Sequence, residues 1–236
     1  MQRYFSSKLD NNKFILNDDD IYHILRVMRM KENDLIEVVY NHELYICKLK
    51  LNENVEVIID KKIDNTINEE ISKILIVPLL KENKMDLILQ KATELGINKI
   101  IPVIMERSII KLDESKEEKR IERWTRICKE ASEQSKRVDI PEVTKIKRIE
   151  ELKDLEGNKI ICSTSENSLN LKNFLNNNKK YDKIYMVVGP EGGISPKEEQ
   201  KLVDLGFTRV SLGKRIMRVE TVPLFLLSAL NYEYME

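Results

Sequence analysis

From residue 74 onward, short apolar runs alternate with amphipathic stretches, and this alternation limits the possible folds more than any other feature of the chain. The expected strands lie at 74–79, 100–105, 160–162, 184–188 and 210–212. The expected helices lie at 85–95, 121–135, 196–205 and 222–234, and Gly96 and Gly206 end two of them. Such an alternation is typical of a parallel sheet with helices on both faces. We therefore expect an α/β domain in this part of the chain.

The first part of the chain has a different, β-rich pattern. The expected strands lie at 35–40, 44–49 and 55–59. Asn41-His42-Glu43 is expected to turn the first hairpin, because Asn tolerates the left-handed backbone conformation of a tight turn. A helix is expected to begin at Asp18-Asp19-Asp20. Its apolar face would consist of Ile21, Ile24, Leu25 and Met28. This pattern predicts a small barrel or sandwich with one helix.

A polar segment separates the two patterns. Residues 64–70 contain few apolar side chains and are typical of a linker. We place the domain boundary near residue 70, which gives one domain at 1–70 and a second at 71–236. A chain of 236 residues is long enough for each domain to bury its own core.

Composition argues against several functional classes. The 40 Lys and Arg residues balance 40 Asp and Glu residues, so a nucleic-acid partner would be held by a local basic surface. Three scattered cysteines suit a reducing compartment, and two histidines argue against a zinc site, so we expect no metal. No apolar run approaches the ~20 residues that span a bilayer, and the first residues lack the apolar region of a signal peptide. We expect a soluble, cytoplasmic protein.

Two loops near the C-terminus each follow an expected strand and lead into an expected helix. The first is Gly189-Pro190-Glu191-Gly192-Gly193-Ile194-Ser195, and the second is Leu212-Gly213-Lys214-Arg215-Ile216-Met217-Arg218-Val219-Glu220-Thr221. Ligands of open α/β sheets bind at the carboxyl ends of the strands. The two loops therefore predict one ligand crevice built from both.

The end of the first loop is explained by its structural role alone, whereas the glycines of the loop allow two interpretations. Ser195, Pro196 and Glu198 have the spacing of a capping box with proline in the first turn. Gly192-Gly193 could form a plain turn, or could let a ligand approach the backbone closely. Pairing with the second loop favours a ligand loop.

The second loop interleaves cations with apolar residues, which again allows two interpretations. Lys214, Arg215 and Arg218 could be solvated cations of a surface loop. Alternatively, Arg218 points at an electron-rich substrate group while apolar side chains line a slot. The residues of that slot would be Ile216, Val219 and Val222. We interpret Thr221 as a helix cap rather than a catalytic residue.

Several familiar nucleotide and nucleophile motifs are missing. The chain has no G-x-G-x-x-G after a strand and no G-x-x-x-x-G-K-[ST] loop, which disfavours ordinary dinucleotide and nucleoside triphosphate sites. It also lacks a G-x-S-x-G nucleophile elbow.

A locally basic group lies near the N-terminus, among Tyr4 and Tyr22. With Arg137, at the end of the charged helix, it forms our candidate RNA-binding set: Arg3, His23, Arg26, Arg29, Lys31 and Arg137. Phosphate contact and an ordinary solvated surface are both open interpretations of these residues.

Five motifs together resemble one enzyme family. They are GPEGGIS at 189–195, LGKRIMRVET at 212–221, EASEQSKR at 130–137, KATELG at 91–96 and HILRVMRMK at 23–31. The chain resembles the RsmE-type 16S ribosomal RNA (uridine-N3) methyltransferases of the SPOUT superfamily. The resemblance implies a PUA-like N-terminal barrel domain that binds RNA and an α/β domain with a deep trefoil knot. It also implies S-adenosylmethionine as methyl donor and a homodimer with its active site near the subunit interface.

Carried onto this chain, the family pattern implies specific site residues. One knot loop would contain Gly189, Glu191, Gly192 and Gly193, and the other Leu212, Gly213, Ile216, Met217 and Arg218. Backbone groups would hold the adenine and ribose, and apolar side chains would pack on the adenine. Met217 and Val222 depart from the Leu and Ala that are more usual in such enzymes, but both are apolar.

Methylation at N3 requires loss of the N3–H proton. Arg218 would stabilise negative charge on the uracil oxygens, and Glu191 or Glu220 would accept the proton. The sequence does not separate these two acids. Because N3 lies on the pairing edge, the uridine of 16S rRNA, within the small ribosomal subunit, must be unpaired first. A ribose 2′-O-methyltransferase and a non-catalytic RNA-binding module are the alternative functions.

Overall fold

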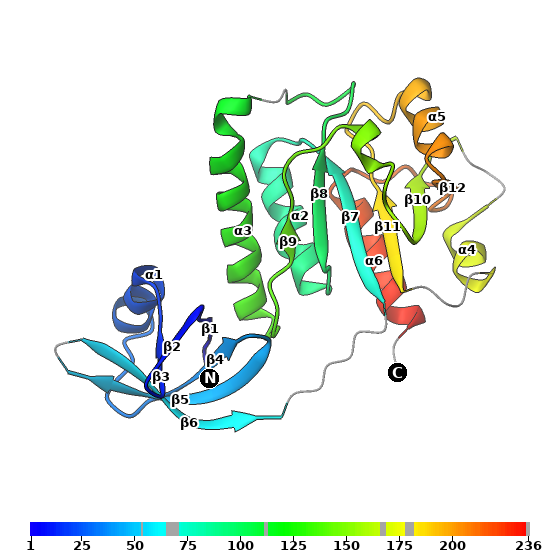
Figure 1. Ribbon diagram of the computed structural model, residues 1–236. Helices are drawn as coiled ribbons and strands as arrows, with labels where there is room; N and C mark the ends of the chain where they lie inside the picture. The colour runs from blue at the N-terminus through cyan, green and yellow to red at the C-terminus, as the bar shows by residue number, and fades with distance from the viewer. Residues whose placement is uncertain (53, 65–70, 111–112, 166–168, 178–181, 235–236) are drawn as a thin grey trace. The chain divides into compact units, whose positions relative to one another are not determined.

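The computed structural model describes residues 1–52, 54–64, 71–110, 113–165, 169–177 and 182–234 (Figure 1). The chain forms two compact units. The first contains Met1–Asn68 and Lys129–Ile140, and the second contains Glu69–Cys128 and Pro141–Glu236. Segment 129–140 was expected in the second domain, yet its contacts place it in the first unit. Residues 65–70 of the expected linker lie outside the described residues.

The first unit contains a six-stranded sheet in the order β1-β4-β5-β6-β3-β2. Its strands are β1 (Arg3–Phe5), β2 (Lys8–Asp10), β3 (Lys13–Ile15), β4 (Leu35–Tyr40), β5 (Glu43–Leu51) and β6 (Val55–Ile63). β1 pairs with β4 in parallel, and the other pairs are antiparallel. Asn41 and His42 turn the β4–β5 hairpin with φ of 51° and 63°, which confirms the expected left-handed turn.

The helix predicted from Asp18 is present but changes type after five residues. α1 (Asp18–Tyr22) is capped by the Asn17 side chain, which accepts a hydrogen bond from the Asp20 N–H at 2.8 Å. A π-helix (His23–Val27) follows directly. Ile24 is fully buried, but the expected apolar positions Leu25 and Met28 are exposed. The wider π turn breaks the 3.6-residue period from which that face was predicted.

The second unit contains six parallel strands in the order β12-β10-β11-β7-β8-β9. The strands are β7 (Ser72–Pro78), β8 (Lys99–Val103), β9 (Glu142–Val143), β10 (Asn158–Cys162), β11 (Lys183–Val187) and β12 (Thr208–Val210). The helices are α2 (Glu82–Glu94), α3 (Glu117–Gln134), α4 (Leu171–Asn177), α5 (Pro196–Asp204) and α6 (Thr221–Glu233), and the last residues of α3, from Lys129 on, belong to the first unit. The expected α/β architecture is therefore confirmed.

Both faces of this sheet are covered, as five consecutive buried residues of β7 at 74–78 indicate. On one face, Ile74 and Ile76 belong to a core that includes Leu202 of α5 and Leu152 of a short 3₁₀ helix (Ile149–Leu152). On the other face, α2 and α6 pack side by side (Figure 1). Continuous apolar strands are what a sheet buried on both faces requires.

The strand order places a switch point beside β7. From β7 the chain continues to β8 on one side, whereas β11 pairs with the other edge of β7 and leads to β12 beyond β10. Connections that diverge in this way leave a crevice at the carboxyl ends of the two strands. The fold thus predicts a ligand site at the ends of β7 and β11.

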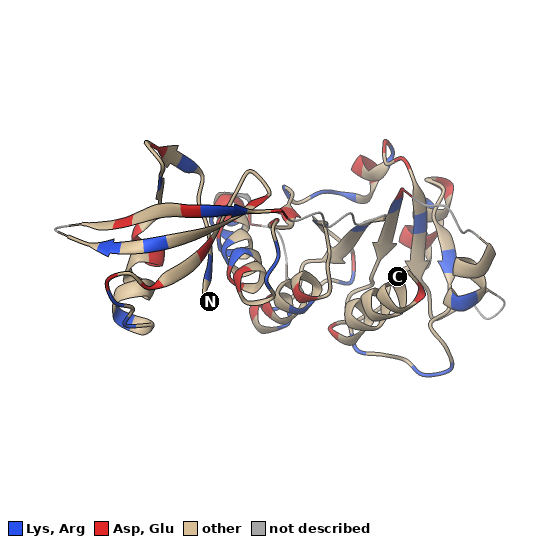
Figure 2. Ribbon diagram, turned by 90° about the horizontal axis from the view of Figure 1, so that it is seen from below, with Lys and Arg blue, Asp and Glu red and all other residues tan. Residues whose placement is uncertain are grey.

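Charges of both signs are interspersed along the ribbon of each unit (Figure 2). Within the described residues, no helix is both long enough and apolar enough to cross a membrane.

Candidate active site

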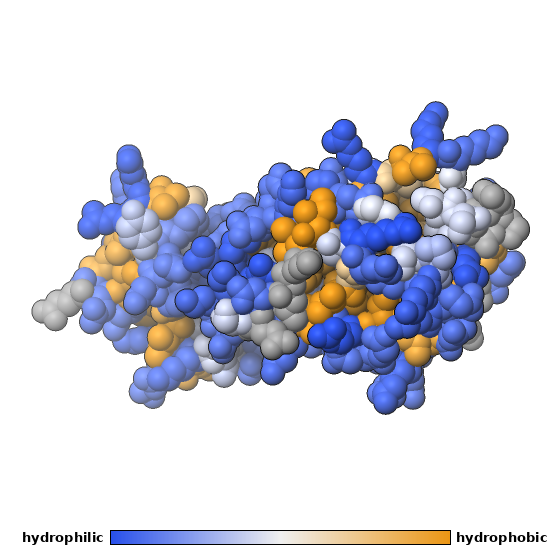
Figure 3. Space-filling model, turned by 90° about the horizontal axis from the view of Figure 1, so that it is seen from above, coloured by the Kyte–Doolittle hydropathy of each residue, from blue (hydrophilic) through white to orange (hydrophobic). Residues whose placement is uncertain are grey.

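A cavity of about 520 Å³ lies at the carboxyl ends of β10 and β11. Its lining comes from the start of α2, the ends of β10 and β11, both predicted loops, α5 and α6. The view from the side of the carboxyl ends of the strands shows hydrophobic residues exposed among hydrophilic ones (Figure 3). The expectation that the two loops build one crevice is confirmed.

The first loop follows β11 and is shaped by its glycines. Gly193 has a φ of 72°, and its N–H donates to the Pro190 carbonyl at 2.8 Å in a tight turn. A Cβ on Gly192 would lie 3.1 Å from the Cβ of Arg107, whose guanidinium donates to the Gly192 carbonyl at 3.1 Å. The loop therefore needs small residues because of its own backbone and its neighbour Arg107.

The predicted capping box at the start of α5 is confirmed. Ser195 Oγ accepts a hydrogen bond from the Glu198 N–H, and Glu198 Oε2 accepts one from the Ser195 N–H. Glu198 Oε1 also accepts from the Glu106 N–H at 2.6 Å, which ties the loop after β8 to α5. This buried box fixes the exit of the first loop.

The second loop contributes a short run of residues to the cavity. Ile216, Met217, Arg218 and Val219 line it, together with Val222 of α6. Ile216 is 84% exposed, an unusual position for so large an apolar side chain. The three residues predicted to form an apolar slot, Ile216, Val219 and Val222, all line this cavity.

Two expectations for this loop need correction, and a third stays a prediction. Leu212 and Gly213 are not among the residues that line the cavity, which the loop reaches from Ile216 onward, so their contact with a cofactor stays a prediction. The expected strand at 210–212 lies at Thr208–Val210. Thr221 is the first helical residue of α6 and no cap; the N-cap is Glu220, which makes no capping hydrogen bond.

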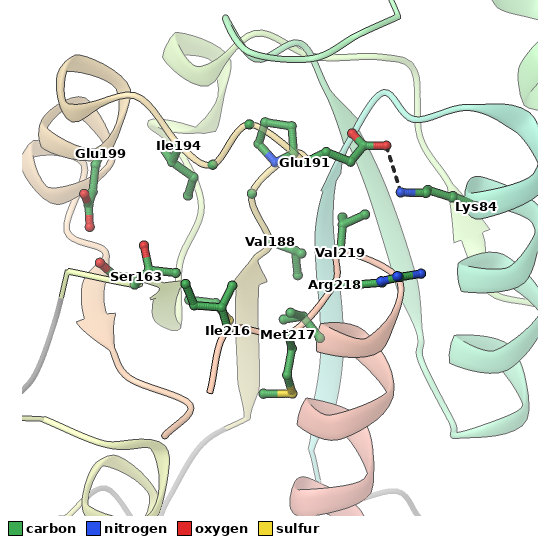
Figure 4. A pocket seen from close by; sticks show the side chains of 17 residues that line it. Lys84, Ser163, Val188, Glu191, Ile194, Glu199, Ile216, Met217, Arg218 and Val219 are labelled. Atoms are coloured by element: carbon green, nitrogen blue, oxygen red, sulfur yellow. Dashed lines mark ion pairs between the residues drawn. The ribbon is translucent and has the colours of Figure 1, made fainter. Parts of the chain in front are cut away.

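Charged side chains gather at one end of the cavity. Lys84 Nζ, from the first turn of α2, lies 3.2 Å from Glu191 Oε1 and 3.6 Å from Glu220 Oε2. Lys84 and Glu191 point toward each other, and Arg218 lies on the same side of the cavity (Figure 4). Glu220 does not line the cavity, and its Oε2 is buried without a hydrogen-bond partner. The structure thus places Glu191 and Glu220 against Lys84, which was not predicted, and Arg218 on the same side of the cavity.

The opposite end of the cavity contains residues that follow β10. Ser163, Thr164 and Cys162 line it with Glu199 of α5. Burial raises the pKa of the Cys162 thiol to about 12, so this cysteine stays protonated and is not a nucleophile at neutral pH. Glu199 pairs with Arg209 at 3.2 Å. These residues were also not predicted, although the position of Ser163 and Thr164 directly after an expected strand was a usable signal.

The candidate RNA-binding residues of the first unit divide into two groups. Arg3 is buried, pairs with Glu37 at 2.8 Å and donates to the carbonyls of Lys136 and Arg137. Arg137 makes a two-pronged ion pair with Asp139. Arg3 is therefore not a surface cation, and the guanidinium groups of both residues form ion pairs within the fold.

The remaining candidates stay at the surface. Arg26, Arg29 and Lys31 are exposed, and so is Tyr22. His23 is half-buried, and its Nδ1 is 2.9 Å from the Tyr4 hydroxyl. We call Arg26, Arg29 and Lys31 the basic turn.

Comparisons with known proteins agree with this geometry. Residues 68–231 match the model of an RNA methyltransferase domain, and residues 16–60 match the model of an RNA methyltransferase PUA domain. The chain is 31% identical to ribosomal RNA small subunit methyltransferase E of Bacillus subtilis (strain 168), over 99% of this chain and 97% of that protein. It is 33% identical to the protein of that name in Mesomycoplasma hyopneumoniae (strain 232), over 97% of this chain and 98% of that protein.

A solved structure is similar over almost the whole chain. The crystal structure of a ribosomal RNA small subunit methyltransferase E from Neisseria gonorrhoeae bound to S-adenosyl methionine has a TM-score of 0.87 and 32% identity. The match covers 99% of this chain and 98% of that one. The resemblance inferred from the five sequence motifs is thereby confirmed. The chain belongs to the RNA methyltransferase family, with a PUA domain in its N-terminal part.

Proposed function

We propose that this enzyme transfers a methyl group from S-adenosylmethionine to N3 of one uridine in 16S rRNA of the small ribosomal subunit. One observation carries the proposal. The two loops assigned to the cofactor by family resemblance line a single cavity, in a chain 32% identical to a methyltransferase crystallised with that cofactor. The site lies in the α/β unit, at the carboxyl ends of parallel strands, where such ligands bind.

The residues of the cavity fit the proposed cofactor. About 520 Å³ is within the 300–1,000 Å³ typical of small-molecule sites. Gly189, Gly192 and Gly193 bring the backbone to the cavity without side chains, and Ile216 and Met217 supply apolar surface for a purine ring. With Glu191 and Arg218, these residues form the proposed binding set. Bound S-adenosylmethionine would supply the methyl group on a positively charged sulfonium, which makes the methyl carbon electrophilic without further activation.

The chain itself supplies positioning and electrostatics for the reaction. Arg218 lines the cavity with its guanidinium on the side of Glu191, so it can stabilise negative charge on the uracil oxygens. Glu191 and Glu220 are the carboxylates available to accept the N3 proton. The reacting uridine must leave any base pair, which costs a few kcal/mol that RNA contacts would offset.

We assign part of those RNA contacts to the first unit. The basic turn exposes three cations and Tyr22 is exposed in the same unit, which suits phosphate contact combined with base stacking. Half-buried His23 is an additional candidate. Arg3 and Arg137 are left out because their donors are already used within the fold.

Three further features of the proposal come from the family resemblance. They are the deep trefoil knot in the second domain, a homodimer with its site near the subunit interface, and action in the cytoplasm. Exposed apolar side chains support the dimer: Ile216 at the cavity and Phe225 on α6, which is 42% exposed. Such side chains gain stability when a second copy covers them.

A methylation assay tests the proposal. Small subunits and free 16S rRNA from a strain lacking the activity are incubated with the protein and S-adenosylmethionine, and the digested nucleosides are identified by mass spectrometry. We expect 3-methyluridine at one position. A 2′-O-methylated nucleoside would instead establish the ribose methyltransferase. No methylation, with no cofactor binding by calorimetry, would leave a non-catalytic RNA-binding module.

A further inference from the structure

We infer that Lys84 is a positioning residue that lets Glu191 act as the proton acceptor, with Glu220 as the second partner of Lys84. This inference rests on the proposed function and deepens it, because it separates two acids that the sequence leaves equivalent. It follows from the way three segments of the α/β unit meet at the charged end of the cavity.

Three separate segments supply the three groups. Lys84 belongs to the first turn of α2, Glu191 to the loop after β11, and Glu220 to the N-cap of α6. The Lys84 ammonium lies 3.2 Å from Glu191 and 3.6 Å from Glu220. The three side chains are partly buried, with exposed fractions of 27%, 21% and 18%. One ammonium therefore bridges two carboxylates in a partly desolvated place.

The two carboxylates differ in their access to a substrate. Glu191 lines the cavity, whereas Glu220 does not. Glu220 Oε2 is buried and has no hydrogen-bond partner, so its interaction with the protein at that atom is the ion pair with Lys84. Only Glu191 can meet a uracil ring in the cavity, and Glu220 acts through Lys84.

The charge balance explains why a base at this position needs both partners. A lysine paired with a single carboxylate would be left as an unpaired, partly buried cation when that carboxylate accepts a proton, which is costly. Here the Lys84 ammonium keeps Glu220 as its partner when Glu191 becomes neutral, and the two distances are similar. Glu220 thus lowers the cost of protonating Glu191.

The transfer balances without any further reactant. The N3–H bond breaks and its proton passes to the Glu191 carboxylate. The electron pair left on N3 forms the bond to the methyl carbon, and the electrons of the former carbon–sulfur bond remain with sulfur. Lys84 keeps its charge throughout. The other charged groups of the cavity are Arg218 on the same side and Glu199 at the opposite end, and Arg107 contacts the Gly192 carbonyl.

Two variants have opposite expected effects on the pH dependence of turnover. In Lys84→Met, the two carboxylates face each other without the ammonium, so activity is lost at a higher pH on the acid side than in the wild type. In Glu220→Gln, the ammonium acts on Glu191 alone. The fall of turnover on the acid side therefore moves to lower pH, and the maximal turnover decreases. We expect the plateau to fall about tenfold or more, and Glu191→Gln to lose about 10² or more.

Controls separate these effects from misfolding. Lys91→Met removes a more exposed lysine of the same helix, which pairs with Glu94 instead, and should leave the profile unchanged. Lys84→Arg keeps the positive charge and should restore much of the wild-type profile. Calorimetry with S-adenosylmethionine and thermal denaturation establish that each variant folds and binds cofactor.

A measurement without cofactor or RNA tests the arrangement directly. The protein is labelled with glutamate that carries ¹³C at its carboxyl carbon, and the Glu191 signal is assigned with Glu191→Gln and followed with pH. We expect the midpoint of this titration to lie at higher pH in Lys84→Met and at lower pH in Glu220→Gln than in the wild type. The same direction in both variants, or a Lys84→Met profile equal to that of Lys91→Met, would overturn the inference. Absence of methylation by the wild type would instead refute the proposed function, and the titration would still report on Lys84.

Discussion

Glu133 offers the sharpest test of electrostatics in the first unit. It lies near the end of α3 and is 9% exposed. Lys129 Nζ is 3.4 Å from Glu133 Oε1, but it lies closer to Asp20, at 2.7 Å from both carboxylate oxygens. Burial raises the pKa of Glu133 to about 7, Lys129 opposes this rise, and Asp20 adds to it. We therefore expect Glu133 to be protonated in the native state below neutral pH.

The sign of the effect on stability follows from proton counts. The pKa of Glu133 rises from 4.5 in the unfolded chain to about 7 in the folded one, so between these values the native state binds more protons. The contribution of this group to stability is complete below pH 4.5 and is lost as pH rises through 7. A tenfold change in a proton-binding constant corresponds to about 1.4 kcal/mol, so the contribution has an upper limit of about 3 kcal/mol.

Glu133→Gln removes the ionisation and keeps the size of the side chain. We expect the variant to be more stable than the wild type by about 1–3 kcal/mol at pH 8, and to show no such gain at pH 4.5. Lys129 keeps its ion pair with Asp20 in the variant. Urea unfolding followed by circular dichroism at the two pH values measures the difference.

Glu118→Gln is the matched control, because Glu118 is an exposed residue of the same helix. Its free energy of unfolding should change little between the two pH values. If Glu133→Gln instead weakened the protein at pH 8, Glu133 would be an ionised, stabilising partner of Lys129. Burial would then not be the dominant influence on the Glu133 carboxyl.

Three further predictions concern the proposed site. Gly193→Val should abolish cofactor binding in calorimetry, since a β-branched residue at a φ of 72° distorts the loop; a retained affinity would show that the loop tolerates strain. Arg218→Ala should lower kcat more than cofactor affinity, whereas equal losses would place Arg218 in the binding site alone. Charge reversal at Arg26 and Arg29 should weaken RNA binding in a filter assay and flatten its salt dependence while cofactor affinity is kept; unchanged RNA affinity would remove the basic turn from the interface.

The α/β unit was largely predictable from sequence because its signals are long and redundant. Strands β7, β8 and β11 are buried on both faces and appear as apolar runs, and Gly96 and Gly206 have φ of 80° and 85° at helix ends. Strands β1, β2 and β3 have three residues each. So short a strand shows no period, and its pairing with distant partners defines it.

The site was predictable in its loops and in the charges that these loops carry, but Lys84, which pairs with two of them, was not predicted. Glycines and cations mark the loops locally, and the residues after a strand are always candidates in such folds. By contrast, Arg3 looked like a surface cation, and only its register opposite Glu37 in the parallel β1–β4 pair explains its burial. An ion pair between distant segments depends on strand order, which periodicity does not determine.

Strand order also explains why the charged end of the cavity lies where it does. β7 pairs with β11, so the helix that follows β7 begins beside the loop that follows β11, and Lys84 meets Glu191. α6 packs along α2, which brings the N-cap of α6, Glu220, to the other side of the same lysine. If β7 lay elsewhere in the sheet, Lys84 would be an ordinary surface residue of α2. Its role is therefore set by the topology of the sheet, and the pH profiles of Lys84→Met and Glu220→Gln test that topology as well as the chemistry.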